Sequence, residues 1–240
     1  MKVLYVDVDR TLTGPGGDLF YGGSTRIADA LVRARAGGLT VVPISGRGRV
    51  QVSELCRLLG LPRGIGELGC VHVEGREVRY ELGRFPFRGE TPVEAMLARG
   101  AIGAVVDFGL EPYEPWNEGR EATYLLRADR TVDIAAANDE LDRLGFGWCR
   151  LVDNGMAFHL APAGTGKPSG VEIDRAHHGL ARDEVAYVGD SAGDLACADV
   201  VGECWLVANA DMSLEWPLRT AGAYGEGVAE VVDRLLPQVR

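Results

Sequence analysis

The sequence is poor in positive charge and almost free of lysine. Its 240 residues include 25 basic and 35 acidic side chains, so the formal net charge is -10. A chain with this balance has no basic face able to neutralise a nucleic-acid backbone, and we exclude nucleic acid as a partner. Only Lys2 and Lys167 are lysines, and every other basic residue is arginine. A lysine kept in such a composition is a candidate for a specific chemical role.

Two further features are missing. The five cysteines are scattered and odd in number, without Cys-x-x-Cys spacing, which favours structural thiols over a disulfide framework or a zinc site. No apolar run reaches 18 residues, and the apolar stretch before Asp7 is too short for a signal peptide. We therefore expect a soluble, cytoplasmic protein without a membrane partner. Composition leaves the oligomeric state open.

Short apolar runs predict the strands of a buried parallel sheet. The runs at 3–6, 39–44 and 185–188 have the continuous apolar character of such strands. Apolar residues at helical spacing between 27 and 32 predict a connecting helix, which Gly37 and Gly38 end. The first part of the chain is therefore a βαβ unit, typical of a doubly wound α/β fold.

Polar residues follow three of these runs directly. Asp7 follows the first run, Ser45 the second and the Gly189-Asp190 pair the third. In open α/β sheets ligands bind at the carboxyl ends of the strands. We therefore expect these side chains to converge on one pocket.

The pattern changes in the middle of the chain. The predicted elements there are a helix at 92–99, a strand at 121–127, a helix at 132–144 and a final hairpin. This order is typical of an inserted α+β domain. The prediction is a doubly wound, Rossmann-like core in residues 1–83 and 164–240, with an α+β cap in residues 84–163.

The hairpin of the cap has a readable register. Asn154-Gly155 favours a two-residue type I′ turn, which would pair Asp153 with Met156. The same register places Arg150 opposite His159, with Trp148 on their face of the hairpin. That face is either exposed to solvent or, if it closes over the pocket, in contact with a ligand.

Two carboxylates two residues apart, Asp7 and Asp9, stand at the rim of the sheet. A carboxylate about 4 Å from a phosphate dianion meets roughly 8 kcal/mol of repulsion at an effective dielectric constant of about 20, so this chemistry needs cations. Mg²⁺ suits such a site because it binds carboxylate oxygens and bridges to phosphate. Asp190 is the natural second ligand, and Asp194 lies on the same side of the opening helix. Lys167, in a glycine-rich helix entry, can neutralise charge as it develops.

These motifs resemble the haloacid dehalogenase superfamily, in particular its large-cap phosphatases (the Cof-like, sugar-phosphate branch), and the resemblance covers nearly the whole chain. It implies a set of roles: nucleophile, Asp7; general acid/base, Asp9; phosphate contacts, Ser45, Gly46 and Asn209; charge stabilisation, Lys167; and Mg²⁺ ligands, Asp7, Asp9 through its carbonyl, Asp190 and Asp194. Two positions depart from the family pattern. Arg10 stands where glycine is usual, and Gly193 stands where asparagine is common.

The predicted activity is therefore Mg²⁺-dependent hydrolysis of a phosphomonoester through an aspartyl phosphate. By analogy with the family, the partner is a small phosphorylated metabolite such as a sugar phosphate, and Trp148, Arg150 and His159 would contact its leaving group. A phosphosugar mutase and a catalytically idle sugar-phosphate sensor remain alternatives. We expect Arg47 to be a solvated arginine outside the site.

Overall fold

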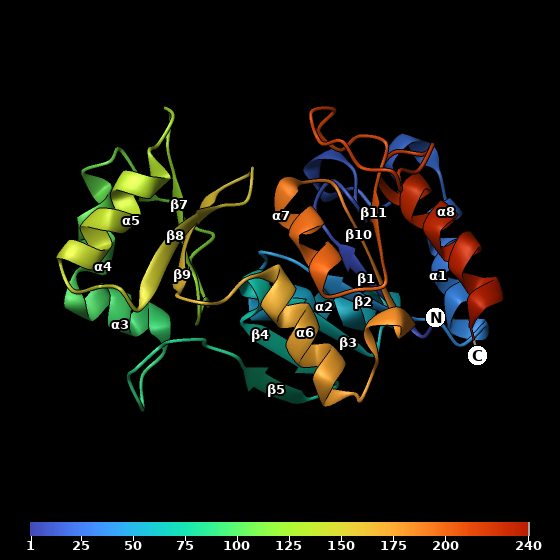
Figure 1. Cartoon of the computed structure of the whole chain (residues 1–240), viewed down its shortest axis with the longest axis horizontal. Coiled ribbons are helices and arrows are strands. Elements are labelled where there is room, and N and C mark those ends of the chain that lie inside the picture. Colours follow the sequence, from blue (N-terminus) through green and yellow to red (C-terminus); the bar gives the residue numbers. More distant parts are fainter. Residues whose placement is uncertain (240) are drawn as a thin grey trace.

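The computed structural model describes residues 1–239 and has two lobes, each built on its own sheet (Figure 1). The large sheet has seven strands in the order β11-β10-β1-β2-β3-β4-β5. Their bounds are Glu203–Leu206, Val185–Gly189, Val3–Asp7, Thr40–Ile44, Arg63–Gly66, Val71–Glu74 and Glu77–Tyr80. The strands from β11 to β3 are parallel, whereas β4 and β5 join by antiparallel pairing.

Helices cover both faces of this sheet. Successive side chains of a strand point to opposite faces, and in β1 the side chains on both faces are apolar and buried. Leu4 and Val6 of β1 pack toward α1 (Arg26–Ala36) and α8 (Tyr224–Leu235), while Tyr5 packs on the opposite face with α6 (Lys167–His177). The remaining core helices are α2 (Arg49–Leu59) and the short α7 (Ala192–Leu195). The mixed α/β prediction with a large parallel sheet is confirmed.

The second lobe is an antiparallel sheet with helices on one side. Its order is β6-β7-β9-β8, with bounds Glu111–Pro112, Tyr124–Arg127, Phe158–Pro162 and Cys149–Asp153. The helices α3 (Pro92–Arg99), α4 (Ala101–Val106) and α5 (Ile134–Arg143) cover its outer face (Figure 1). All these elements fall within the segment 84–163, and we call this lobe the cap. The free face of its sheet is turned toward the core lobe.

The predicted register of the cap hairpin is wrong by two residues. Asp153 pairs with Phe158, and Arg150 faces Ala161 instead of His159. The turn is longer than two residues because the Asn154 side chain accepts hydrogen bonds from the backbone N–H groups of residues 156 and 157. A shift of two keeps every side chain on its predicted face, since side chains alternate with a period of two.

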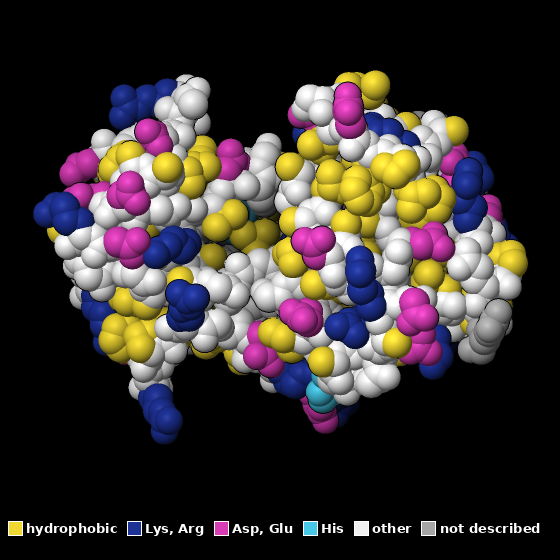
Figure 2. Space-filling view, viewed as in Figure 1, with side chains coloured by type: hydrophobic (Ala, Val, Ile, Leu, Met, Phe, Trp, Pro, Cys, Tyr) yellow, Lys and Arg dark blue, Asp and Glu magenta, His cyan; other side chains and the backbone are white. Residues whose placement is uncertain are grey.

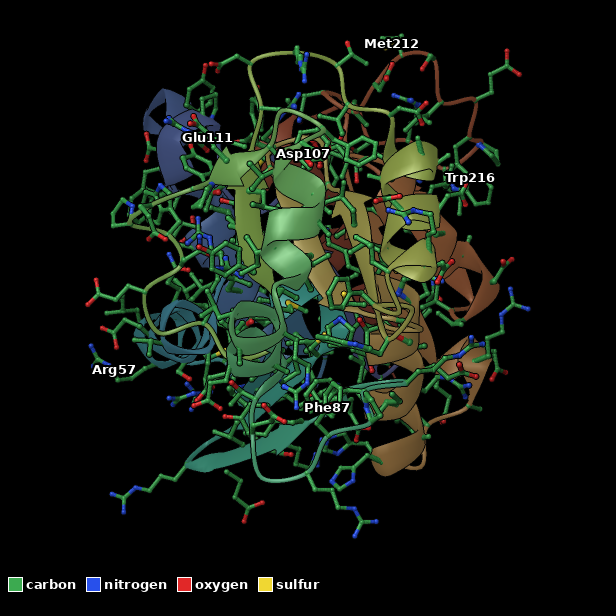
Figure 3. All side chains as sticks on the ribbon, turned by 90° about the vertical axis from the view of Figure 1, so that its left-hand side faces the viewer. Arg57, Phe87, Asp107, Glu111, Met212 and Trp216 are labelled. Atoms are coloured by element: carbon green, nitrogen blue, oxygen red, sulfur yellow. The ribbon has the colours of Figure 1, made fainter. Side chains whose placement is uncertain are left out.

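The chain crosses between the lobes beside an aromatic cluster at the base of the cap. Phe87, labelled in Figure 3, packs edge-on against Trp148, with 5.3 Å between the ring centroids. The Arg99 guanidinium lies over the Phe87 ring, 3.7 Å from its centroid. Such contacts stabilise the exit from the core lobe. Within residues 1–239, no helix combines the length and the apolar character needed to cross a membrane.

Candidate active site

Three buried carboxylates and one lysine meet where β1 and β10 end. The Nζ atom of Lys167 lies 2.6 Å from Asp7 Oδ1 and 2.6 Å from Asp194 Oδ1. Oxygen atoms of Asp7, Asp190 and Asp194 all lie within 4.8 Å of one another. The parallel register places Val6 beside Val188, so the residues that follow the two strands are neighbours in space. The structure thus brings together four side chains that the sequence analysis put in one site.

Asp194 is engaged on both carboxylate oxygens. Its Oδ1 atom accepts from Lys167 and from the Tyr187 hydroxyl, both at 2.6 Å. Its Oδ2 atom accepts from the Asp190 and Ser191 N–H groups and from the Ser191 hydroxyl. Although burial opposes ionisation, Lys167 and these donors hold the pKa of Asp194 below its usual range. Asp194 therefore holds Lys167, and the metal role that the sequence analysis gave it stays a prediction.

Asp7 and Asp190 are the carboxylates left for a metal. Burial raises the pKa of Asp7 to about 8, with repulsion from the neighbouring aspartates adding to burial and Lys167 opposing it. Burial and the charge of Asp194 likewise raise the pKa of Asp190 to about 6. These shifts mean that the cluster is short of positive charge. A hard divalent cation such as Mg²⁺ fits this set of buried oxygen donors.

Asp9 is held by an arginine that the sequence analysis left out. The Arg47 guanidinium donates to both carboxylate oxygens of Asp9, with Nη2 2.7 Å from Oδ1 and Nε 3.1 Å from Oδ2. Ser45 Oγ lies 3.4 Å from Asp9 Oδ2 and accepts from the Arg47 N–H. The expectation of a solvated Arg47 is wrong because the turn after β2 directs its side chain inward over β1. Its guanidinium thus lies close to Ser45, since both residues contact Asp9 Oδ2.

Close backbone contact positions Lys167 at the start of α6. A Cβ atom on Gly69 would lie 2.2 Å from the Gly166 carbonyl oxygen, and one on Gly170 would lie 2.6 Å from Gly69 Cα. Gly69 also has φ of +100°, which disfavours any other residue. Only glycines allow the loop after β3 to touch the first turn of α6, and this contact sets the height of Lys167 over β1.

Asn209 lies next to the site but has structural partners. Its amide donates to the Arg10 carbonyl oxygen at 2.8 Å and accepts from the Tyr224 N–H at 2.7 Å. Arg10 itself has φ of +65°, in the left-handed region where glycine is favoured, and its Nε lies 3.5 Å from Asp190 Oδ2. Asn209 therefore holds the loop after Asp9, and its phosphate role stays a prediction.

The three cap candidates occupy different places. His159 is buried against Gly46 of the core, with its ring 3.0 Å from where a Cβ of that residue would stand. Arg150 forms an ion pair with Asp142 at 2.9 Å, and Trp148 belongs to the aromatic cluster at the base of the cap. Only His159 thus approaches the turn after β2 that holds Ser45 and Gly46, and roles for the other two in specificity stay predictions.

Two further residues join the cap to the core, and no sequence signal marks either one. Arg120 Nη2 donates to the Gly46 carbonyl oxygen at 2.8 Å. Glu67 of the core is fully buried and accepts the N–H groups of Glu121, Ala122 and Thr123, the shortest bond being 2.7 Å. Their importance depends on a contact between segments more than 50 residues apart. We call the contacts of Glu67 with residues 121–123 the cap anchor.

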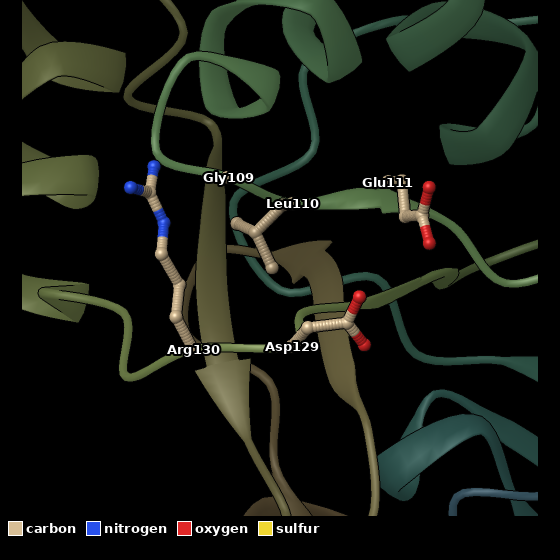
Figure 4. A pocket seen from close by; sticks show the side chains of 5 residues that line it. All are labelled: Gly109, Leu110, Glu111, Asp129 and Arg130. Carbon is tan, nitrogen blue, oxygen red and sulfur yellow. The ribbon is translucent and has the colours of Figure 1, made fainter.

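The surface is hollowed between the two lobes, with apolar side chains on the floor of the hollow (Figure 2). A separate pocket lies within the cap, between the loop before β6 and the turn after β7 (Figure 4). It is lined by Gly109, Leu110, Glu111, Asp129 and Arg130. None of these belongs to the carboxylate cluster or its neighbours, so the chemistry is assigned to the sheet edge.

Sequence relatives match almost the whole chain, although no family model matches it. The chain is 28% identical over 238 residues to a phosphoglycolate phosphatase of Natronomonas pharaonis, and the match covers 96% of each chain. A phosphoglycolate phosphatase of Methanospirillum hungatei is 28% identical over 247 residues, covering 100% of this chain and 98% of the relative.

Solved structures share the complete two-lobed fold. A Thermoplasma acidophilum protein superimposes with a TM-score of 0.79 at 20% identity, covering 98% of this chain and 97% of its own. A haloacid dehalogenase-like hydrolase from Bacteroides thetaiotaomicron gives 0.75 at 19% identity, with coverages of 98% and 99%. The sucrose-phosphatase of Synechocystis gives 0.68 at 15% identity, with coverages of 97% and 96%.

This chain thus shares its fold with all three structures. The two sequence relatives are both phosphatases, and the matches cover nearly their full length. In this chain the aspartates of two strand ends meet a lysine at the carboxyl edge of the large sheet. The chain is therefore a phosphatase that is similar over nearly its whole length to phosphoglycolate phosphatases and shares the fold of a haloacid dehalogenase-like hydrolase.

Proposed function

We propose that this phosphatase requires Mg²⁺, forms a phosphoaspartate at Asp7, and acts on a small phosphorylated acid, with phosphoglycolate as the leading candidate. The observation that carries the proposal is the cluster of Asp7, Lys167 and Asp190. Lys167 holds Asp7 Oδ1 at 2.6 Å, which orients the carboxylate and leaves its other oxygen to attack phosphorus.

The two steps divide between Asp7 and Asp9. Asp7 bonds to phosphorus while the bond from phosphorus to the leaving oxygen breaks, and protonated Asp9 gives that oxygen its proton. As a carboxylate, Asp9 then takes a proton from water, which attacks phosphorus and releases inorganic phosphate and free Asp7. Arg47 fixes the position of Asp9 before substrate enters.

The metal would be held by Asp7 and Asp190, together with the Asp9 carbonyl that the family resemblance implies. When bound, Mg²⁺ supplies the positive charge that offsets repulsion between the attacking carboxylate and the phosphate. Lys167 adds a fixed cation on the other side of Asp7 and stays protonated, because the neighbouring carboxylates raise its pKa despite burial.

Contact between the lobes supports a small leaving group. Arg120 and His159 of the cap reach Gly46, the residue after Ser45, so little room remains above the phosphate-binding loop when the lobes meet in this way. This favours a two- or three-carbon substrate over the sugar phosphate expected from the family. The curated relatives carry the name of a two-carbon substrate, phosphoglycolate, which agrees with this size. The sucrose-phosphatase shares only the fold.

The test is phosphate release from a panel containing phosphoglycolate, other small phosphomonoesters and sugar phosphates, with Mg²⁺ and with excess chelator. We expect the highest kcat/KM for phosphoglycolate and no turnover with chelator. Asp7→Asn should lower kcat at least about 1,000-fold while the circular dichroism spectrum stays unchanged.

Three outcomes would contradict the proposal. Wild-type turnover by Asp7→Asn would exclude the covalent route. Phosphate transfer to a second hydroxyl of the substrate, dependent on a bisphosphate activator, would indicate a mutase. Binding of phosphomonoesters without release from any of them would indicate a sensor.

A further inference from the structure

Three cap side chains meet over one core residue, Gly46. Arg120 donates to its carbonyl oxygen at 2.8 Å. A Cβ atom at this position would stand 3.0 Å from Asn154 Nδ2 and 3.0 Å from the nearest His159 ring atom. Glycine is required here because any side chain would push the cap hairpin away. The next residue toward β2 is Ser45, so the three cap side chains lie beside the expected phosphate position.

The hydrogen bonds of Asn154 fix the proton on His159. Its Oδ1 atom accepts from the N–H groups of Met156 and Ala157, so the amide orientation is set and Nδ2 must be a donor. This Nδ2 lies 3.0 Å from His159 Nε2, which therefore accepts. A neutral His159 must then carry its proton on Nδ1, and Nδ1 has no hydrogen-bond partner within residues 1–239. A buried N–H group left unpaired is costly, so it calls for a ligand.

Arg120 supplies a buried positive charge at the same place. Its guanidinium donates to the Trp116 and Gly46 carbonyl oxygens and to the Thr123 hydroxyl, all neutral acceptors. In the described part of the chain it forms no direct ion pair. Burial lowers its pKa to about 10, and the Glu67 carboxylate, which shares the Thr123 hydroxyl with it, opposes this shift. A guanidinium has five N–H groups, so these three hydrogen bonds leave further N–H groups of Arg120 available to a ligand. Buried charges in proteins are normally paired.

We propose that Arg120 and His159 form a carboxylate-binding site for the leaving group, with Asn154 as the positioning residue that orients the imidazole. The inference rests on the proposed function and specifies its substrate class, a phosphorylated short hydroxy acid. The acid group pairs with the spare guanidinium donors and accepts the Nδ1–H of His159. A neutral leaving group of the same size can accept a hydrogen bond but supplies no negative charge to pair with the guanidinium.

The experiment compares phosphoglycolate with 2-hydroxyethyl phosphate, which has the same two-carbon length but a hydroxyl in place of the carboxylate. The readout is the ratio of their kcat/KM values. We expect Arg120→Gln to lower this ratio about 100-fold, because a charged hydrogen-bonded partner is lost only for the acid. His159→Phe keeps the ring and should lower the ratio about tenfold. Inhibition by free glycolate should weaken in both variants.

Arg120→Lys is the matched charge control. It keeps the cation but loses the planar fork, so the ratio should fall between the wild-type and Arg120→Gln values. A melting curve for each variant shows that it is folded. A general loosening of the cap would lower both kcat/KM values together and leave the ratio unchanged.

Three results would overturn the inference. If Arg120→Gln left the ratio of the two kcat/KM values unchanged, the guanidinium would not bind the acid group of the substrate. Equal losses for both substrates, together with weaker inhibition by inorganic phosphate, would assign Arg120 to the transferred phosphate instead. If the wild-type protein hydrolyses neither substrate but does hydrolyse others, the inference fails while the phosphatase activity stands. If it hydrolyses no phosphomonoester, the proposed function itself fails.

Discussion

At the scale of single residues, the site combines fixed positive charges with crowded carboxylates. Lys167 neutralises Asp7 and Asp194, while Arg47 neutralises Asp9. Arg10 contacts Asp190 from a half-exposed position, at an Nε to Oδ2 distance of 3.5 Å. Each carboxylate therefore lies beside a cation, with Lys167 shared by Asp7 and Asp194, and Asp190 is the one paired most loosely.

Removing the charge of Arg10 is expected to strengthen Mg²⁺ binding. Its guanidinium repels a cation at Asp190, although exposure to solvent weakens the effect. Arg10→Gln should lower the half-saturating Mg²⁺ concentration about threefold, measured from phosphate release at varied Mg²⁺. Arg10→Lys keeps both the charge and the left-handed backbone, so it should behave as wild type. A similar change in both variants would point to the backbone instead.

His159 should make stability depend on pH. Burial, with the nearby charges of Arg120 and Lys167, lowers its pKa from 6.5 to about 3. A depressed histidine pKa contributes stability that is present above pH 6.5 and is lost as pH falls toward 3, since the unfolded chain takes up the proton first. Between pH 7 and pH 5 the contribution of His159 to the free energy of unfolding falls by about 2 kcal/mol. Urea unfolding of His159→Phe should show no such pH-dependent loss. If the free energy of unfolding depended on pH equally in the wild type and the variant, the burial of the ring would be contradicted.

At the scale of elements, the site depends on strand ends and on how α6 meets its neighbours. Tyr5 and Tyr187 stand side by side on β1 and β10, and their hydroxyls bind Asp174 of α6 and Asp194 respectively. Asp174 also pairs with buried Arg63. These contacts fix α6 against the sheet, so the position of Lys167 is determined by packing along the whole helix.

Gly69→Ala is expected to displace Lys167. The new Cβ would collide with the Gly166 carbonyl oxygen, in addition to straining a backbone with φ of +100°. We expect a loss of about 3 kcal/mol in the free energy of unfolding and at least a tenfold lower kcat. Gly179→Ala is the matched control, since Gly179 also has positive φ, +62°, but no atom within 4 Å of its Cβ position. It should cost about 1 kcal/mol and leave kcat unchanged.

At the scale of the whole molecule, the cap is tied to the core at more places than its two chain crossings. The cap anchor joins Glu67 to residues 121–123, and Arg49 forms an ion pair with Glu121 at 2.8 Å. Arg120 adds a contact to the phosphate-binding loop itself. The orientation of the cap and the shape of the site are therefore coupled, because the same short segment carries the anchor and Arg120.

Weakening the cap anchor should loosen the cap before the core unfolds. Glu67→Gln removes the charge that strengthens the bonds to residues 121–123, and we expect a loss of about 1–2 kcal/mol in stability. Hydrogen exchange should rise at the amides of Ala122 and Thr123 but not in β1. Glu121→Gln, which breaks only a half-exposed ion pair, should cost less than about 1 kcal/mol. Equal effects of the two substitutions would argue against a special role for Glu67.

Much of the core follows from local pattern. The strands β1, β2 and β10 and the helix α1 lie where apolar runs and glycine stops predicted them, and Lys167 opens α6 as its glycine-rich entry indicated. Asp7, Lys167 and the acidic pair could also be identified from the sequence, because each follows a strand or begins a helix. Hydrophobic periodicity and stop residues act over a few positions, so the sequence displays them directly.

Tertiary structure decided which of these groups are free and which are engaged. Asp194 and Asp190 look equivalent in sequence, yet five donors from α6, β10 and the following turn occupy only the first. The inward turn of Arg47, the meeting of Arg120 with Gly46 and the longer hairpin loop depend likewise on contacts between distant segments. The sequence by itself determined which charged residues stand at the strand ends and at the start of a helix, because their spacing is local. The fold determined which of them are paired and which cap residues lie beside them, because hydrogen-bond partners and burial exist only once distant segments meet.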